Sequence, residues 1–338
     1  MIHLQRQIER DLAASLTALP GYRQARWRAV ILYGMAGIGK TAMARTLTDD
    51  DQVKKAFRDG IAWVDGSRDP EEEVMRLCLG FSLERKLGER WIECWRRWTS
   101  AAERRLLLIV DDMLSAESLP PLIAGLGPQV VALITAQQGA EIRGEVERWL
   151  PAEAITEVGI HGLRPDEGRA LVEAVIEHSL VDVEWDMVQE IGELIGWHPE
   201  ALRLAGIESR EIGWAGALGD LRAGRMCWDG IRGLVMRQWQ RLIADHQTKL
   251  MTLIENITSN TVFTTGEAAQ CWGTEPAIAA RQIWMLEHCG FVIKKTTSKA
   301  GSPQLCVEPI ISLVLPRDLQ RQETKNGDGR HATLPCDE

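Results

Sequence analysis

The residues with the clearest chemistry form a glycine-rich loop near the start of the chain. The run Gly34-Met-Ala-Gly-Ile-Gly39-Lys40-Thr41 has the full G-x-x-x-x-G-K-[ST] pattern. Glycines let consecutive backbone N–H groups turn inward around phosphate oxygens, and a following helix adds the positive end of its dipole. A lysine at this position supplies a charge for the β- and γ-phosphates, and a threonine hydroxyl can ligate Mg²⁺. We therefore predict an ATP or ADP site with Mg²⁺, with Lys40 in a catalytic role and Thr41 as a metal ligand. The predicted phosphate-binding residues are Gly34, Gly37, Ile38, Gly39, Lys40, Thr41 and Ala42.

A pair of acids about 70 residues after this loop is the second half of the predicted site. The apolar run Leu106 to Val110 ends directly in Asp111 and Asp112. A buried strand of this kind would carry the acids to the edge of a sheet beside the phosphates. We expect Asp111 to hold the Mg²⁺ through its water shell, and Asp112 to orient or deprotonate an attacking water.

A parallel sheet is the element that must position both motifs. Short apolar runs at 29–33, 61–64, 106–110, 130–134 and 155–158 predict five strands, and helical stretches separate them. Strands alternating with helices indicate an α/β domain whose mostly parallel sheet is covered on both faces.

The pattern changes after residue 160, where short helices follow one another. Helices are predicted to begin near Pro165, Trp185 and Pro199, and the glycine-rich stretch 213–224 is interpreted as a connector and hinge. Further on, helices at 249–257, around 264–273 and at 276–289 precede the strand-like runs FVIKK and QLCVEP. Three helices followed by a β-hairpin is the order of a winged-helix domain.

A tryptophan–arginine helix between the second and third strands allows two interpretations. Trp91, Trp95 and Trp98 form one stripe, whereas Arg96, Arg97, Arg104 and Arg105 are expected to point elsewhere. The combination could stack nucleic-acid bases. We favour a core-facing stripe with a solvated basic face, because this helix must pack against a central strand. The acidic run Glu71-Glu72-Glu73 is likewise assigned to the solvated surface or to a helix cap.

The composition limits the class of protein. The 338 residues carry 39 Lys+Arg and 48 Asp+Glu, so the formal charge is −9, which disfavours a protein that coats nucleic acid. No apolar run is long enough to span a membrane, and no signal peptide is evident. The 7 cysteines are widely spaced, which predicts reduced thiols and a cytoplasmic protein.

Five motifs in order resemble the NB-ARC module of STAND signalling ATPases, a group that includes plant resistance proteins, apoptotic adaptors and bacterial regulators. They are GMAGIGKT, LLLIVDD, VVALITAQQ, IHGLRPDEGRAL and LIGWHPEALRLAG, and the resemblance covers roughly residues 24–315. It implies that Thr135, on the sensor strand, and Pro199, in the G-x-P segment, contact the bound nucleotide. It also implies a winged helix at the end of the module.

Three departures from the family pattern bear on activity. The sensor strand ends Ile134-Thr135-Ala136-Gln137 where the family has an arginine that reads the γ-phosphate. Gln137 is neutral, so we predict slow or negligible hydrolysis, at most a weak Mg²⁺-dependent ATPase. The winged-helix segment carries Glu308 where the family presents a histidine to ADP. A glutamate would repel the phosphate, which predicts that ADP stabilises the inactive form only weakly. The upstream element matches only as Gln7-Ile8-Glu9-Arg10.

The resemblance implies a nucleotide-dependent switch in bacterial signalling or defence. ADP would hold a closed form, and exchange for ATP would release surfaces for homo-oligomerisation. Because neither an effector domain nor a repeat array is evident, we expect the effector or sensor protein to be encoded separately. The predicted segments are an N-terminal helical arm at 1–23, a P-loop domain at 24–159, a helical domain at 160–224, a winged helix at 225–315 and a disordered tail at 316–338.

Two alternatives stay open from the sequence. A DNA-binding AAA+ ATPase of the replication-initiator type also joins a P-loop domain to a winged helix, and Lys294, Lys295 and Lys299 would favour it. The winged-helix region is balanced in charge, however, and its recognition helix holds one arginine among apolar residues, so binding to nucleic acid is not expected. The other alternative is a scaffold that holds nucleotide without hydrolysing it.

Overall fold

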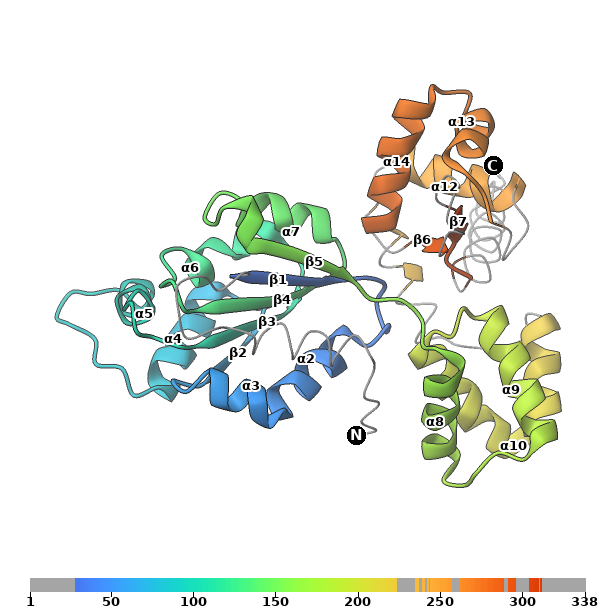
Figure 1. Ribbon diagram of the computed structural model, residues 1–338, viewed down its shortest axis with the longest axis horizontal. Helices are drawn as coiled ribbons and strands as arrows, with labels where there is room; N and C mark the ends of the chain where they lie inside the picture. Colours follow the sequence, from blue (N-terminus) through green and yellow to red (C-terminus); the bar gives the residue numbers. More distant parts are fainter. Residues whose placement is uncertain are drawn as a thin grey trace, which may run out of the picture. The chain divides into compact units, whose positions relative to one another are not determined.

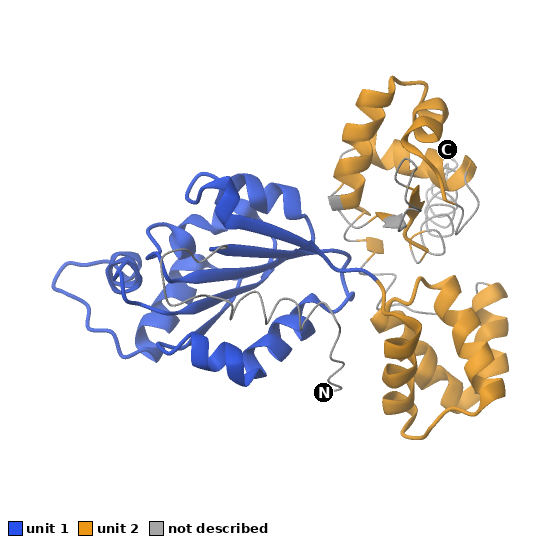
Figure 2. Cartoon of the chain, viewed as in Figure 1, with its two compact units in different colours: residues 1–161, 288–290 blue, residues 162–287, 291–338 orange. Residues whose placement is uncertain are grey.

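The computed structural model describes residues 28–223, 235–236, 239–240, 242, 244–256, 262–288, 291–295, 304–309 and 311. The chain divides into two compact units (Figure 2). The first consists of Met1–His161 with His288–Gly290, and the second of Gly162–Glu287 with Phe291–Glu338. The predicted N-terminal helical arm at 1–23 and the predicted tail at 316–338 lie outside the described residues.

The first unit is built on a five-stranded sheet in the order β2-β3-β4-β1-β5, in which all pairs are parallel. The predicted strands are confirmed, each with its ends within a few residues of the expected ones. The sheet order places β4 between the strand that precedes the glycine loop and the strand that carries the acids. The strands are β1 (Ala29–Tyr33), β2 (Ile61–Asp65), β3 (Leu107–Met113), β4 (Val131–Ala136) and β5 (Ile155–Gly159).

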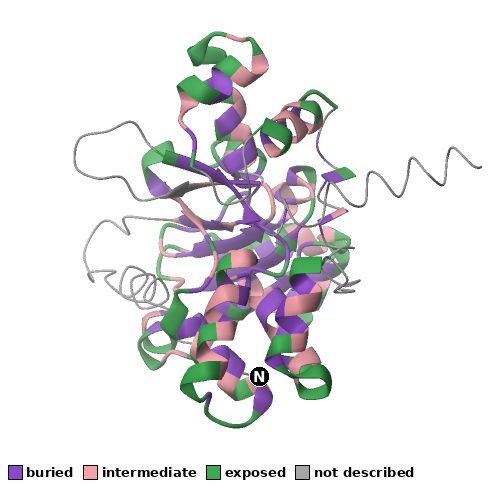
Figure 3. Ribbon diagram, turned by 90° about the vertical axis from the view of Figure 1, so that its right-hand side faces the viewer, coloured by how far each residue is buried: buried purple, intermediate pink, exposed green. Residues whose placement is uncertain are grey.

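Helices cover both faces of this sheet (Figure 1). On one face, alternate residues of β1 to β4 form a single core with the helices of the 70–146 region, and Trp95 is its largest fully buried side chain. The other face packs against α2. Figure 3 shows the strands as the buried centre of the unit. The helices are α2 (Lys40–Asp49), α3 (Asp51–Ala56), α4 (Pro70–Gly80), α5 (Trp91–Thr99), α6 (Pro120–Ile123) and α7 (Gly139–Val146).

The tryptophan stripe of α5 belongs to the core, as expected. Trp95 is fully buried, and Trp91 and Trp98 pack partly buried against the same core cluster. Arg96 and Arg97 are exposed, as expected for a solvated basic face, whereas Arg104 and Arg105 are half-buried. Arg97 pairs with Glu89 at 2.8 Å. Arg104 pairs with Asp59 at 3.0 Å, and its guanidinium lies 4.3 Å from the centre of the Trp98 ring. The ion pairs of Arg97 and Arg104 therefore hold the loops that carry Glu89 and Asp59 in place.

The second unit begins with three helices, α8 (Pro165–Ile176), α9 (Asp182–Leu194) and α10 (Pro199–Ala223). The predicted connector at 213–224 is confirmed only at Gly213, where a kink with φ of 72° joins two helical segments of α10, and it is wrong for residues 214–223, which are helical. The reason is the buried stripe Trp214, Ala217, Leu218 and Leu221, whose spacing outweighs the glycine content of this stretch.

Among the described residues, further helices and a pair of strands follow in the second unit. The helices are α12 (Ala244–Asn256), α13 (Thr265–Trp272) and α14 (Pro276–His288), and the strands are β6 (Val292–Lys295) and β7 (Gln304–Val307). β6 and β7 pair antiparallel, with Val292 opposite Val307, and Phe263 bridges to Leu305. The order of elements agrees with the prediction, and the assignment of this region as a winged helix stays a prediction. Among the described residues, no helix is both long and apolar enough to cross a lipid bilayer.

Candidate nucleotide site

The glycine loop connects the end of β1 to the start of α2. Gly34, Gly37 and Gly39 have φ values of 145°, 79° and 102°, conformations that side-chain-bearing residues rarely adopt. A Cβ at Gly34 would lie 2.5 Å from the carbonyl oxygen of Ile160, so that position also lacks room for a side chain. Met35, Ala36 and Ile38 are buried. The loop therefore presents backbone together with the N-terminus of α2, as an anion cradle requires.

Lys40 lies inside this loop. Its Nζ donates to the carbonyl oxygens of Gly34 at 2.8 Å and Met35 at 3.0 Å, and the residue is only 8% exposed. Burial lowers the pKa of Lys40 to about 8, and the charges of Asp112 and Asp111 oppose this shift. The first unit therefore holds a desolvated cation that can attract a phosphate, next to two carboxylates that would repel it unless a metal cation accompanies it.

Asp111 is the centre of a hydrogen-bond network that joins three elements. Its Oδ1 accepts from the Thr41 hydroxyl at 2.9 Å and from the Thr135 hydroxyl at 2.6 Å. Asp111 is 9% exposed and Thr135 is fully buried. The network thus links α2, β3 and β4 at the carboxyl edge of the sheet, and it brings together three residues that were predicted separately from the sequence.

Asp112 differs from its neighbour in conformation and exposure. Its φ is 54°, and the β3–β4 register shifts between Val110 and Met113, so the strand bulges here. The Asp112 backbone N–H donates to the Thr135 hydroxyl at 2.8 Å, and its side chain is exposed. A non-glycine residue held in this region is uncommon and marks a constrained site. The bulge turns one carboxylate inward and leaves the other accessible.

The oxygen donors suit Mg²⁺ bound together with a phosphate. The described residues contain no group of three or more His, Cys, Asp or Glu that could hold a metal ion by themselves. Mg²⁺ commonly keeps several waters and binds through one or two protein oxygens and the phosphates of its substrate. Thr41 and Asp111, whose oxygens lie 2.9 Å apart, fit that donor set.

Thr135 contributes a structural role that can be tested separately from nucleotide binding. We expect Thr135→Val to lower the free energy of unfolding by about 1–3 kcal/mol, because its buried hydroxyl serves both Asp111 and the Asp112 amide. Denaturant unfolding measures this change. The matched control is Thr46→Val on α2, whose hydroxyl makes an exposed bond to Ala42, with an expected change within about 0.5 kcal/mol. Equal stability of the two variants would contradict the role given to Thr135.

The turn after β2 was not singled out in the sequence, yet it lies beside the acid strand. Asp65 is the register partner of Asp111, and the Gly66 amide donates to the Asp111 carbonyl at 2.6 Å. Asp65 accepts from the Ser67 hydroxyl and from Arg68 Nε at 2.9 Å. The Ser67 hydroxyl holds the pKa of Asp65 below its usual value, with Arg68 adding to the effect. The turn is thus anchored at the same sheet edge as Asp111.

The acidic run after this turn is only partly solvated. Glu71 and Glu72 are exposed, but Glu73 is 4% exposed, so its assignment to the solvated surface or a cap is wrong. Its carboxylate accepts from Arg76 at 2.6 Å and from the Asp65 amide at 3.3 Å. Glu73 therefore ties the start of α4 to the end of β2, a contact that requires the tertiary position of β2.

Pro199, the remaining predicted nucleotide contact, lies in the second unit as the first residue of α10. The turn before it is tightly packed. Gly196 and Trp197 have φ values of 64° and 55°. The Trp197 ring lies against two glycines, where a Cβ would come within 2.5 Å at Gly168 and 2.7 Å at Gly192. This packing explains why the sequence has small residues on α8 and α9, and it holds Pro199 at the helix start.

Glu308 lies against the same turn within the second unit. The residue is 3% exposed and follows β7. A Cβ at Gly196 would lie 2.7 Å from Glu308 Oε1 and 2.9 Å from Pro309 Cδ, so glycine is needed for this approach. The two segments that the resemblance relates to the nucleotide, Gly196–Pro199 and Val307–Ile311, thus contact each other, which the sequence did not indicate.

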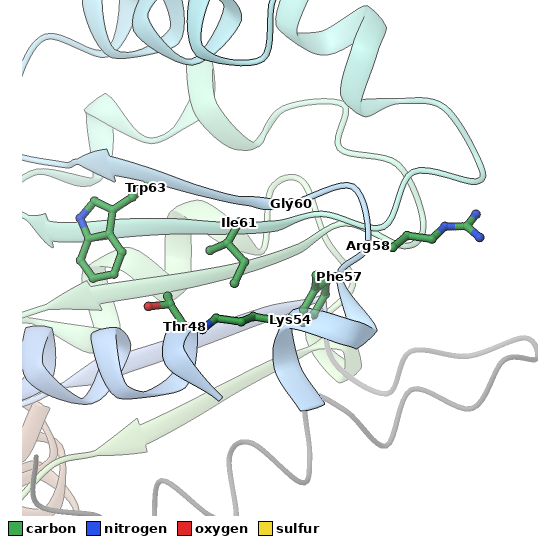
Figure 4. Close-up of a pocket in the computed structure, with 7 residues that line it drawn as sticks. All are labelled: Thr48, Lys54, Phe57, Arg58, Gly60, Ile61 and Trp63. Carbon is green, nitrogen blue, oxygen red and sulfur yellow. The ribbon is translucent and has the colours of Figure 1, made fainter. Parts of the chain in front are cut away.

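A pocket of about 550 Å³ lies on the α2 and α3 side of β2 (Figure 4). Gly60 and Ile61 place it near the start of β2, whereas the phosphate loop follows the end of β1. Since the strands are parallel, this pocket belongs to the opposite edge of the sheet from the glycine loop. It is lined by Thr48, Lys54, Phe57, Arg58, Gly60, Ile61 and Trp63.

The sheet, the loop and the acid strand define the P-loop NTPase class. Residues 20–129 match the family model of the NB-ARC domain, so this segment of the chain is similar to that family. The match confirms the resemblance over the glycine loop and the acid strand, and the matching family implies nucleotide binding. It ends before β4 and the second unit.

Comparisons of whole chains add distant similarities. No curated protein matches the sequence. Cdc6p from Pyrobaculum aerophilum is 12% identical, with a TM-score of 0.39 and 96% of both chains covered. A chain of Drosophila ORC bound to DNA is 13% identical, with a TM-score of 0.40, covering 91% of this chain and 85% of that one. A RuvB mutant from Thermotoga maritima is 12% identical, with a TM-score of 0.38, covering 94% of this chain and 93% of that one.

Proposed function

We propose that this protein is an ATP/ADP-dependent molecular switch of the STAND type. The observation that carries the proposal is the network of Thr41, Asp111 and Thr135 beside the buried Lys40. These groups form one phosphate-binding edge from three separate parts of the sequence. An NB-ARC domain model that matches residues 20–129 supports the same class.

Each residue has a defined part in this mechanism. The loop amides and Lys40 bind the phosphates, and Thr41 and Asp111 hold Mg²⁺ when it accompanies the nucleotide. Mg²⁺ then supplies neutralisation of the phosphate charge. Thr135 orients Asp111, with its hydroxyl 2.6 Å from Oδ1. The accessible carboxylate of Asp112 orients a water. Hydrolysis is expected to be slow, because neutral Gln137 ends β4 where an arginine would stabilise the developing charge.

The second unit supplies the moving part of the proposed switch. We assign residues 160–224 to a helical domain and 225–315 to a winged helix. The seating of Glu308 and Pro309 on Gly196 supports a contact between these two parts that a bound nucleotide could stabilise or release. A switch requires an element with two states, and this contact can be either formed or released. ADP and ATP must then favour these two states to different extents.

A protein partner fits the exposed face of α14 better than a nucleic acid does. Ile278 and Trp284 on this helix are 48% and 43% exposed, and Arg281 is its one arginine. Exposed apolar side chains of this size suit protein contacts, whereas duplex binding needs several phosphate-directed cations, and α14 has one arginine. We therefore propose a protein partner and ATP-dependent homo-oligomerisation in the cytoplasm. A salt-dependent shift with duplex DNA at physiological ionic strength would instead favour the replication-initiator alternative.

The experiment that tests the switch identifies its ligand first. The full chain is purified without added nucleotide and denatured, and the released nucleotide is identified by ion-pair chromatography. We expect ADP or ATP at close to one per chain. Absence of adenine nucleotide, together with no binding of added Mg²⁺–ADP, would contradict the proposal. Light scattering with ADP and with ATP then tests oligomerisation, and single-turnover hydrolysis separates a slow switch from a non-hydrolysing scaffold.

A further inference from the structure

The phosphate edge of the first unit carries few cations. A transferring γ-phosphate needs charge from the loop lysine and, in many P-loop proteins, from an arginine as well. The connections after β3 and β4 begin with Leu114-Ser115 and Gln137-Gln138, which carry no positive charge. Apart from His161 after β5, the cations on the described carboxyl-edge turns of this unit are Lys40 and Arg68.

The turn that carries Arg68 is held against the acid strand. Asp65 and Asp111 are register partners, so their Cα atoms lie about 4.8 Å apart across the two parallel strands. The Gly66 amide donates to the Asp111 carbonyl at 2.6 Å. A Cβ at Gly66 would lie 2.9 Å from the Met113 Cα. The turn therefore cannot move away from β3 without breaking this packing.

Asp65 also lies on the correct face of the sheet. Side chains alternate along β2, and Ala62 and Val64 belong to the core on one face. Asp65 consequently points to the other face. Val110 and Ile134 belong to the same core as Ala62, which puts Asp111 and Thr135 on that other face as well. This is the face that α2 and its Thr41 contact.

The guanidinium of Arg68 is oriented but weakly held. Its Nε lies 2.9 Å from Asp65 Oδ2, and its Nη1 lies 4.0 Å from Glu73 Oε1. Glu73 has a closer partner in Arg76, at 2.6 Å. The Arg68 side chain is 59% exposed, and exposed ion pairs of this kind contribute little to stability. The guanidinium can therefore exchange a carboxylate for a phosphate, whose oxygens its planar fork matches.

We propose that Arg68 binds the γ-phosphate oxygens of ATP and is the side chain by which this protein distinguishes ATP from ADP. The inference rests on the proposed nucleotide function and names the residue that reads its state. Arg68 then supplies, from the turn after β2, the positive charge that Gln137 does not supply from the end of β4. Asp65 holds the guanidinium ready when the γ-phosphate is absent.

The test compares two nucleotides on the full chain after bound nucleotide has been removed. Calorimetric titration with Mg²⁺–ADP and with the non-hydrolysable Mg²⁺–adenylyl imidodiphosphate gives both affinities. We expect Arg68→Ala to weaken binding of the triphosphate analogue about 10-fold or more and to leave ADP within about 2-fold. The affinity of Arg68→Lys for the triphosphate analogue should lie between those of the wild type and Arg68→Ala, because lysine keeps the positive charge but lacks the planar guanidinium.

Arg76→Ala is the matched control. Arg76 is 60% exposed and pairs with Glu73 on the same helix start, so its loss tests the ion-pair cluster while the Arg68–Asp65 pair keeps both its members. Both affinities should stay as in the wild type. Arg68→Ala that changes neither affinity, or both equally, would overturn the assignment while the nucleotide function stands. A wild-type chain that binds neither nucleotide would overturn both, and circular dichroism confirms that each variant is folded.

Discussion

Lys40→Ala should abolish nucleotide binding, with a loss of affinity of at least about 100-fold for both ADP and ATP. The lysine is 8% exposed inside a loop that has no other cation. Removing it leaves the phosphates with backbone amides and a helix end, whose partial charges are smaller than a full ammonium charge. Calorimetric titration and the nucleotide content of the purified chain measure the effect.

The control for Lys40→Ala is Lys54→Ala on α3. Lys54 is 51% exposed and lines the pocket at the opposite edge of the sheet, so its loss should leave nucleotide affinity unchanged. Lys54→Ala should change stability little, whereas Lys40→Ala removes the donor of two loop carbonyls, so circular dichroism checks that this variant is folded. A Lys40→Ala chain that still retains ADP through purification would show that the site is assigned wrongly.

Trp95→Ala should produce the largest loss of stability in the first unit, about 3–5 kcal/mol in the free energy of unfolding. The indole is fully buried, its Nε1 donates to the Leu122 carbonyl at 3.2 Å, and its ring lies 5.6 Å from that of Trp98. Truncation removes this packing and also leaves the carbonyl without its donor. Far-ultraviolet circular dichroism during urea unfolding measures the change without depending on tryptophan fluorescence.

Trp149→Ala provides the comparison for Trp95→Ala, because Trp149 is 46% exposed and belongs to the same unit. Its loss should change stability by less than about 0.5 kcal/mol. Comparing the stability of Trp95→Ala with that of Trp149→Ala also decides between the two interpretations of the tryptophan–arginine helix. If Trp95→Ala were as stable as Trp149→Ala, the tryptophan stripe would be available for stacking bases, and the core assignment would be wrong.

The proposals make the carboxyl edge of the sheet the part of the molecule that senses the nucleotide. Lys40 follows β1, Arg68 follows β2, Asp111 and Asp112 end β3, and Thr135 ends β4. In a parallel sheet these ends share one edge, so a single ligand can contact residues from four connections. The Lys40 and Arg68 variants test different parts of that ligand, since the first should remove all binding and the second only the preference for a γ-phosphate.

Much of this site was predictable from the sequence because its signals are local. The glycine loop needs particular φ values at Gly34, Gly37 and Gly39, and those needs select glycine at fixed spacings. A run such as 106–110 predicts a buried strand from its own composition, and the acids that follow are carried to its end. The stripe of Trp91, Trp95 and Trp98 predicts a helix face in the same way.

The tertiary structure decided which of these local pieces meet. Inserting β4 between β1 and β3 brings the Thr135 hydroxyl to Asp111, and pairing β2 with β3 brings Arg68 and Glu73 to the phosphate edge. Likewise, packing within the second unit seats Glu308 on Gly196 and continues α10 through a stretch that its glycines had marked as a connector. Strand order and side-chain packing depend on residues far apart in the chain, whereas composition and periodicity report only on neighbours.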